Sequence, residues 1–299
     1  MATSIPQATV RETERRRKQG RNFRYRQTTG RLLLHAILLV CGFFWVYPFL
    51  WALGSSLKSE AGFFSEGLSF IPKEFLWQNY VDAWTQATFG QYFFNTVIIT
   101  VLTVVFTLTF TSMAGFVLAR TSFPGKKWLI ALIAVTLFLP HGYTIVPVFD
   151  LIQRIGLLDT LWSVIVVETA GNMVFSTFLF MGYFSTIDRE LEDAARVDGA
   201  SFHQLFWQVM FPLARPMLAT LGLFTFINSW NNFLIPLVFT LGNSDLRTLP
   251  VGLYAFIAQT STNWVLLCAA SMISLVPTIL VFVFTQRHVI NAFAGAVKG

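Results

Sequence analysis

Six long apolar runs divide this 299-residue chain. They lie at about residues 32–54, 93–119, 128–149, 161–184, 214–241 and 264–285. Each run is close to the ~20 residues that an α-helix needs to cross the hydrocarbon core of a bilayer. The runs lack the alternation of membrane-barrel strands and are too long for such strands. The sequence therefore predicts an all-α membrane protein with six transmembrane helices in one domain, residues 32–285.

The scarcity of charge excludes a soluble globule. Charged residues make up 12% of the chain, about half the usual quarter, which is too few to cover the surface of a protein of this size. The 32 Phe residues exclude a disordered chain. Cys41 and Cys268 both lie inside apolar runs, where we expect inert packing.

The basic residues predict the orientation in the membrane. If the N-terminus is cytoplasmic, only Lys58, Lys73, Arg154 and Arg247 of the 21 basic residues lie outside. This distribution follows the positive-inside rule, so we expect the tails 1–31 and 286–299 to be cytoplasmic. Because the basic tail directly precedes a span, we interpret it as a topology signal that contacts membrane lipid rather than nucleic acid.

A carboxyl group is predicted at membrane depth. Glu168 is the only acidic residue inside an apolar run, where an ionised carboxylate costs about 2.5–3.5 kcal/mol. It is therefore either protonated against a neighbouring helix or part of a polar pathway, with Asn172 one turn away. In the third run, Pro140 and Gly142 flank His141 and precede Tyr143. Broken backbone at this depth must line protein or water.

The fifth run contains an amide cluster. Three amides require hydrogen-bond partners at membrane depth, either a bound polyol that also stacks on an aromatic ring, or neighbouring helices. The cluster comprises Asn228, Trp230, Asn231 and Asn232. With the residues above, these are the candidates for a substrate pathway.

The loop 185–212 is predicted to form two short helices on the cytoplasmic face. Ser185 or Thr186 can cap the first helix, and Gly199 can stop it in a left-handed conformation. Ser201 and Gln204 have the spacing of a capping box for the second helix. The loop is either a docking element for another protein or an ordinary interfacial loop.

The loop sequence ELEDAARVDGASFHQLFWQVMFPLARP resembles the EAA loop of ABC importer permeases, specifically the MalG-like permeases of carbohydrate importers. The family's Glu is Asp193 here, a shortening by one methylene group. Further similarities are Ser56-Leu57-Lys58, Ala114 to Arg120, Trp230-Asn231 and the ending Gly295-Ala296-Val297-Lys298-Gly299.

The resemblance implies the fold of an ABC type I importer permease, with the loop 185–212 coupling the chain to a separate ATPase. It implies half of a translocation pathway for a carbohydrate or a related polyol. The implied ATPase-coupling residues are Glu190, Glu192, Asp193, Ala194, Ala195, Asp198, Gly199 and Ala200. The implied C-terminal tail contact comprises Gly295, Ala296, Val297, Lys298 and Gly299.

The implied partners are two copies of an ABC ATPase subunit, a second homologous (MalF-like) permease and an extracytoplasmic substrate-binding protein, in a prokaryotic inner membrane. The string Gly125-Lys126-Lys127 cannot cradle phosphates, because Arg120 and Lys127 replace the Gly and the Ser or Thr of a phosphate-binding loop. We therefore expect that this chain is not an enzyme and binds no cofactor or metal, and that ATP and Mg bind to the separate ATPase.

Two other classes remain as alternatives. One is a structural or channel-type membrane subunit that is not driven by ATP. The other is an intramembrane enzyme, which would need paired acids, a Ser/His arrangement or an HExxH motif at membrane depth.

Overall fold

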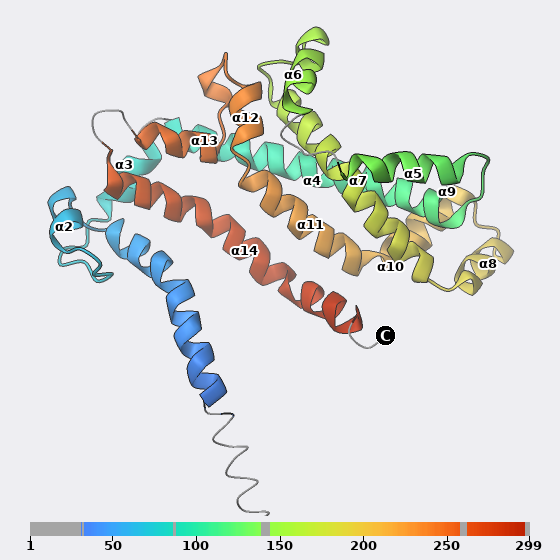
Figure 1. The fold of residues 1–299 in the computed structure, drawn as a ribbon, viewed down its shortest axis with the longest axis horizontal. Coiled ribbons are helices and arrows are strands. Elements are labelled where there is room, and N and C mark those ends of the chain that lie inside the picture. Colours follow the sequence, from blue (N-terminus) through green and yellow to red (C-terminus); the bar gives the residue numbers. More distant parts are fainter. Residues whose placement is uncertain (1–30, 32, 86–87, 139–143, 258–261, 297–299) are drawn as a thin grey trace, which may run out of the picture.

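The computed structural model describes residue 31 and residues 33–85, 88–138, 144–257 and 262–296, without the side chains of residues 255 and 287–296. In this part of the chain the regular structure is helical (Figure 1). The exception within it is one isolated antiparallel bridge between Ile257 and Thr262. The prediction of all-α structure is confirmed for the described residues.

Four helices are long and apolar enough to cross a membrane. They are Leu33–Ser55, α4 (Phe89–Arg120), α7 (Leu161–Thr186) and the Trp264–Gln286 part of α14 (Trp264–Ala296). A fifth candidate is a pair of segments, Phe202–Leu213 and Arg215–Trp230, bent by 74°. The described residues therefore contain four or five of the six predicted crossings as helices of sufficient length.

The third and fifth predicted runs are interrupted. The third divides into α5 (Lys126–Thr136) and α6 (Ile145–Arg154), each too short to span a bilayer alone. In the fifth, α11 (Arg215–Trp230) ends before Asn231, and α12 (Leu234–Phe239) follows. The side chain of Asn232 accepts a hydrogen bond from the backbone N–H of Ile235 at 3.2 Å, which starts the new helix locally.

The short helices lie at the two ends of the long ones. Figure 1 shows α2, α3 and α13 at one end and α8 at the other. The short elements are α2 (Glu60–Ser65), α3 (Gln78–Thr85), α8 (Arg189–Val197), α9 (Phe202–Gln204), the π-helical η3 (Leu205–Met210), α10 (Phe211–Leu213), the 3-10 turns η4 (Ser244–Leu246) and η5 (Tyr254–Phe256), and α13 (Leu249–Leu253).

Helix α4 is the centre of the packing. It lies along α7 and also contacts α11, which in turn packs against α14. A cluster of aromatic and aliphatic side chains fills the end near α8, built around Phe116, Phe180 and Phe206. A second cluster, around Phe89, Trp230 and Leu249, fills the opposite end.

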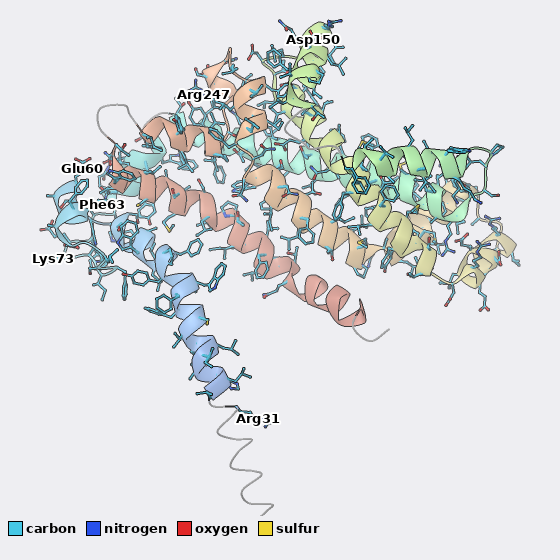
Figure 2. All side chains as sticks on the ribbon, in the orientation of Figure 1. Arg31, Glu60, Phe63, Lys73, Asp150 and Arg247 are labelled. Atoms are coloured by element: carbon cyan, nitrogen blue, oxygen red, sulfur yellow. The ribbon has the colours of Figure 1, made fainter. Side chains whose placement is uncertain are left out.

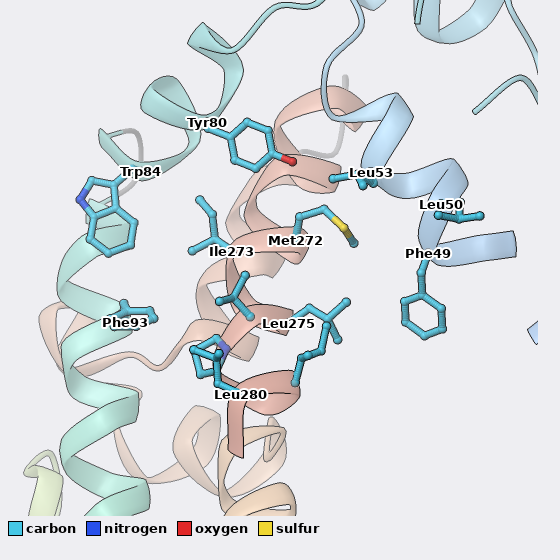
Figure 3. A pocket seen from close by; sticks show the side chains of 13 residues that line it. Phe49, Leu50, Leu53, Tyr80, Trp84, Phe93, Met272, Ile273, Leu275 and Leu280 are labelled. Carbon is cyan, nitrogen blue, oxygen red and sulfur yellow. The ribbon is translucent and has the colours of Figure 1, made fainter. Parts of the chain in front are cut away.

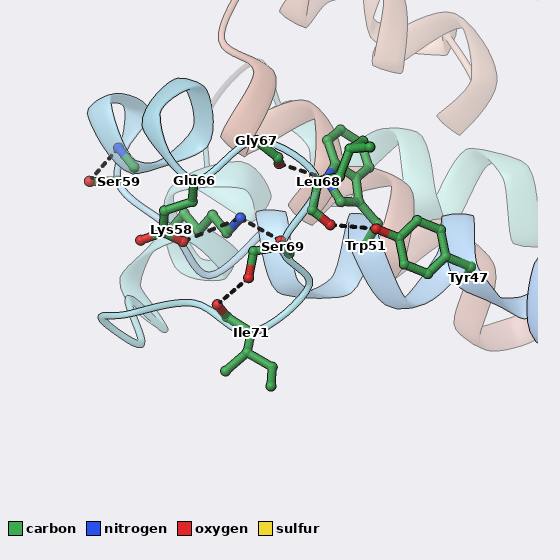
Figure 4. A network of polar contacts seen from close by, with 10 residues as sticks. Tyr47, Trp51, Lys58, Ser59, Glu66, Gly67, Leu68, Ser69 and Ile71 are labelled. Carbon is green, nitrogen blue, oxygen red and sulfur yellow. Dashed lines mark hydrogen bonds and ion pairs between the residues drawn. The ribbon is translucent and has the colours of Figure 1, made fainter.

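The first helix, Leu33–Ser55, projects from this body and is held at its C-terminal end (Figures 1 and 4). The Tyr47 hydroxyl donates to the carbonyl of Leu68 at 2.5 Å, and the Trp51 indole N–H donates to the carbonyl of Gly67 at 3.1 Å. Figure 2 shows Arg31 at the far end of this helix from Lys73. The loop after the helix therefore provides its attachment.

Candidate functional site

Helix α8 begins after Asp188, whose backbone is extended. The predicted caps Ser185 and Thr186 are instead the last residues of α7, so this part of the prediction is wrong. Their hydroxyls donate to the carbonyls of Met181 and Tyr183, both at 2.7 Å. Hydroxyls that bond back to the preceding turn extend that helix instead of starting the next one.

The end of α8 follows the predicted geometry. Gly199 has a φ of +85°, and its N–H donates to the carbonyl of Arg196 at 3.0 Å. The N–H of Ala200 donates to the carbonyl of Ala195 at 2.9 Å. This pair of bonds is a Schellman motif, in which a left-handed glycine stops the helix.

The second helix of the loop starts with the predicted capping box. The N–H of Gln204 donates to the Ser201 hydroxyl at 3.3 Å, and the N–H of Ser201 donates to the Gln204 side chain at 2.8 Å. The helix continues through η3 to α10 and bends at Ala214. The two segments meet at 74°. Pro216, in the first turn of α11, has no N–H to donate to the preceding turn, which favours a break at this point.

Helix α8 presents a mixed acidic and apolar face to its surroundings. The side chains of Leu191 and Val197 are 47% and 87% exposed. Ala195 and Ala200 are half-buried toward the body of the chain. The exposed members of the predicted coupling set are Glu190, Asp193, Ala194, Asp198 and Gly199.

Glu192 points the other way, into the protein. Its carboxylate lies 2.7 Å from the Nε of Arg120, and the two side chains are only 8% and 5% exposed. Arg120 also donates to the carbonyl of Ile187. Arg120 therefore joins the end of α4 both to the C-terminus of α7 and to α8, and Glu192 faces the helical body instead of an outside partner.

Glu168 lies in a polar contact between helices. Its side chain is buried, and the hydroxyl of Ser229 on α11 donates to its carboxyl group. Ser229 also contacts the hydroxyl of Thr100 on α4 at 3.4 Å. Asn172 donates to the backbone carbonyl of Glu168 at 2.8 Å. The carboxyl group thus lies where α4, α7 and α11 meet.

A row of threonines on α4 includes Thr100 and Thr103 at this contact and was not singled out from the sequence. All of its members are buried, and they recur every three or four residues, the spacing of one helix face. The row comprises Thr96, Thr100, Thr103, Thr107 and Thr111. That spacing inside an otherwise apolar run was the available signal, since hydroxyls in the membrane require partners.

The four fifth-run candidates are placed differently. Trp230 is buried and its indole N–H donates to the carbonyl of Ser274 on α14 at 3.0 Å. Asn228 and Asn231 are exposed, although Asn231 also donates to the carbonyl of Ile227 at 2.8 Å. Asn232 lies beside the Glu168 carboxyl group and accepts a hydrogen bond from the N–H of Ile235 in the first turn of α12. The structure therefore brings Asn232 to Glu168 and uses Trp230 in helix packing.

Other predicted site residues fall where less is described. His141 and Tyr143 lie outside the described residues. Gly295 and Ala296 form the end of α14 without described side chains, and Val297, Lys298 and Gly299 lie outside the described part. In the part of the chain that is described, no group of three His, Cys, Asp or Glu side chains is placed to hold a metal ion.

A groove of about 670 Å³ separates the first helix from α14 (Figure 3). Its walls are almost entirely apolar and include Phe49, Trp84, Phe93 and Met272. A carbohydrate needs hydrogen-bonding groups that this groove lacks. The groove therefore offers few of the contacts that would bind a sugar.

Comparison with known proteins identifies relatives over most of the chain. Residues 111–290 match the family model described as binding-protein-dependent transport system inner membrane component. The probable ABC transporter permease protein YurM of Bacillus subtilis is 35% identical over 254 residues, which cover 85% of this chain and 84% of YurM. The diacetylchitobiose uptake system permease protein NgcG of Streptomyces coelicolor is 33% identical, over 85% of this chain and 84% of NgcG.

A solved structure shares the fold. It is a chain of a bacterial ABC transporter involved in the import of the acidic polysaccharide alginate, with a TM-score of 0.76 and 25% identity. The match covers 85% of this chain and 95% of the alginate transporter chain.

Proposed function

This chain belongs to the family of binding-protein-dependent transport system inner membrane components, and we propose that it forms half of the pathway of an ATP-driven carbohydrate importer. It is a multi-pass membrane permease subunit of the ABC type and not an enzyme. The carbohydrate assignment is supported by the relatives, since NgcG is a permease protein of a diacetylchitobiose uptake system and the structurally similar transporter is involved in the import of alginate. A related polyol is the alternative substrate.

Helix α8 is the element that couples this chain to ATP hydrolysis. The observation that carries this proposal is that one side of α8 is exposed and the other is packed against the protein. Leu191 and Val197 are exposed beside Glu190 and Asp193, while Glu192 is held inside. Exposed apolar side chains on a rigidly stopped helix favour docking in a cleft of another protein. That protein is the ATPase subunit, which binds ATP and Mg.

The assembly contains two copies of the ATPase, a second homologous (MalF-like) permease and an extracytoplasmic substrate-binding protein. The chain lies in the inner membrane with both termini cytoplasmic and crosses six times. The interrupted third and fifth runs supply two crossings as pairs of helices, α5 with α6 and α11 with α12. The C-terminal residues 295–299 contact the ATPase pair.

The substrate pathway runs along α7 and α11 and past the break between α5 and α6. Its proposed lining groups are Asn172, Asn228, Asn231, His141 and Tyr143. Glu168, Asn232 and Trp230 support it from behind, because the first two meet each other between helices and the third bonds to α14.

Two substitutions test the coupling proposal. Asp193→Lys reverses an exposed charge, and Gly199→Val strains a left-handed position where nothing lies within 4 Å of an added Cβ. In the complex purified with its native partners, both variants should hydrolyse ATP without driving uptake. Gly156→Val is the matched control, because Gly156 is also left-handed, with a φ of +72°, and has open space around it. Normal ATP-driven uptake by Asp193→Lys and Gly199→Val would refute the proposal.

The substrate class is tested on the same preparation. A screen of mono- and oligosaccharides and polyols against the co-purified binding protein should yield one ligand that stimulates ATP hydrolysis. Absence of stimulation by any binding protein would favour a channel-type subunit.

A further inference from the structure

The ion pair between Arg120 and Glu192 connects α8 to the transmembrane helices. It joins the last residue of α4 to the middle of α8 across 2.7 Å. Among the described residues it is the only ion pair between α8 and a membrane-crossing helix. Since both side chains are more than nine-tenths buried, water screens their attraction weakly.

The surroundings of Arg120 make it a junction of three helices. Besides the Glu192 carboxylate, its guanidinium binds the carbonyl of Ile187, the C-cap residue that follows α7. Arg120 therefore fixes α8 relative to both α4 and α7. The other acidic side chains of α8 lie on its exposed surface, so Glu192 alone among them faces the membrane domain.

Helix α4 can pass a displacement on to the helices around it. It packs along α7 and meets α11 through Thr100 and Ser229. A protein interior is close-packed, so a rigid helix that moves at one end moves its neighbours.

We propose that Arg120 is a positioning residue of the transport cycle, which through Glu192 makes α4 follow the movement of α8. This inference rests on the proposed docking of α8 on an ATPase and adds the route by which that movement enters the membrane. In this arrangement, the covalent connections of α8 to α7 and α9 are insufficient for coupling. The charge pair supplies the attachment to α4.

The test uses the complete complex reconstituted in vesicles with its ATPase, partner permease and binding protein. Three quantities are measured: retained ATPase subunit, ATP hydrolysis and sugar taken up per ATP hydrolysed. Arg120→Glu and Glu192→Arg, each alone, should lower uptake per ATP at least about tenfold, while the ATPase stays bound. The double variant R120E/E192R, which restores an ion pair, and the conservative R120K should each recover most of the uptake.

The matched control is Arg154→Glu. Arg154 pairs with Asp150 on α6 at 2.8 Å, but these side chains are 75% and 55% exposed, so their pairing should contribute little. The control variant should retain the uptake per ATP of the unmodified complex.

Three results would overturn the inference. They are unchanged uptake per ATP in both single variants, a double variant no better than the worse single one, or loss of the ATPase subunit from the single variants. The last result would mean that the pair maintains the docking surface itself. If Asp193→Lys uncouples and Arg120→Glu does not, only the present inference fails. If Asp193→Lys stays coupled, the docking proposal fails and this inference falls with it.

Discussion

A methyl group added to Gly115 on α4 would lie 2.5 Å from the Cβ of Phe180 on α7 and 2.9 Å from the backbone nitrogen of Met181. Both distances are shorter than van der Waals contact, so the two helices touch backbone to backbone at this point. Small residues allow such an approach between helices in membranes. The position of α4 against α7 therefore depends on the absence of one side chain.

Gly115→Ala should destabilise the protein by about 1–3 kcal/mol, because the added methyl forces α4 and α7 apart. The measurement is the thermal unfolding midpoint of the purified protein in detergent. Gly182→Ala on α7 is the matched control, since nothing lies within 4 Å of a Cβ there. Alanine favours a helix by up to about 1 kcal/mol over glycine, so the control should be as stable as the unmodified chain or more so. Equal midpoints for both variants would contradict the contact.

Glu168→Ala and Glu168→Gln should differ in stability. The alanine variant leaves the Ser229 hydroxyl without the carboxyl oxygen that accepts its hydrogen bond, at a cost of about 1–3 kcal/mol for a buried polar group. The glutamine variant keeps an acceptor oxygen of the same reach and should lose less. Asp150→Ala, at a side chain that is 55% exposed, serves as control in the same unfolding assay. A glutamine variant as unstable as the alanine variant would exclude hydrogen bonding as the reason for the residue.

Lys58→Met should destabilise the loop that holds the first helix. The Lys58 ammonium lies 3.3 Å from the Glu66 carboxylate and donates to the carbonyl of Ser69 at 2.6 Å, and its side chain is 1% exposed (Figure 4). Removing one partner of such a buried pair costs about 3–5 kcal/mol, because the other charge remains buried alone.

The double variant K58M/E66L tests the reason for that loss. It removes both charges and should be less destabilised than K58M. Limited proteolysis of the loop 58–69 reports the effect locally, and Lys73→Met, at an exposed position, is the control. If the double variant is cut faster than the single one, the ion pair is not what maintains the loop.

Trp230→Phe should cost about 0.5–1.5 kcal/mol, the net value of one hydrogen bond. The substitution keeps an aromatic ring next to Phe226, whose centroid lies 5.4 Å away, but removes the N–H that donates to Ser274. Trp128→Phe, at a side chain that is 82% exposed, provides the comparison by thermal unfolding. Indistinguishable effects of the two substitutions would show that the bond to α14 contributes nothing.

The features that the sequence predicted well depend on neighbours along the chain. The stop of α8 at Gly199 needs only a residue that tolerates a positive φ, and the capping box needs only Ser201 and Gln204 three residues apart. The apolar runs likewise predict long helices from composition alone. The start of α8 was predicted wrongly because the hydroxyls of Ser185 and Thr186 can bond either to the following helix or to the preceding turn. In the structure they donate to carbonyls in the last turn of α7.

The features that were missed depend on contacts between distant segments. Nothing near Arg120 in the sequence indicates that it binds Glu192 and Ile187. The sequence of α8 contains three acidic residues, Glu190, Glu192 and Asp193, and only packing decides which of them turns inward. The role of Ser229 at Glu168 requires α7 and α11 to be placed against α4 first. A break in the third run was expected from Pro140 and Gly142. The end of α11 before Asn231 was missed, because hydropathy averages over the Asn residues of the fifth run.

The first helix has a mechanical consequence for how this chain tolerates change. The most apolar stretch of Leu33–Ser55 has no residue buried against the rest of the chain. Hydrogen bonds from Tyr47 and Trp51 hold the helix near its C-terminal end. The helix is therefore attached to the rest of the chain near its C-terminal end only. Substitutions in its N-terminal part leave the packing of the other helices unchanged. A substitution at Tyr47 or Trp51 instead changes the orientation of the whole helix, so a small shift at these residues becomes several times larger at its N-terminal end.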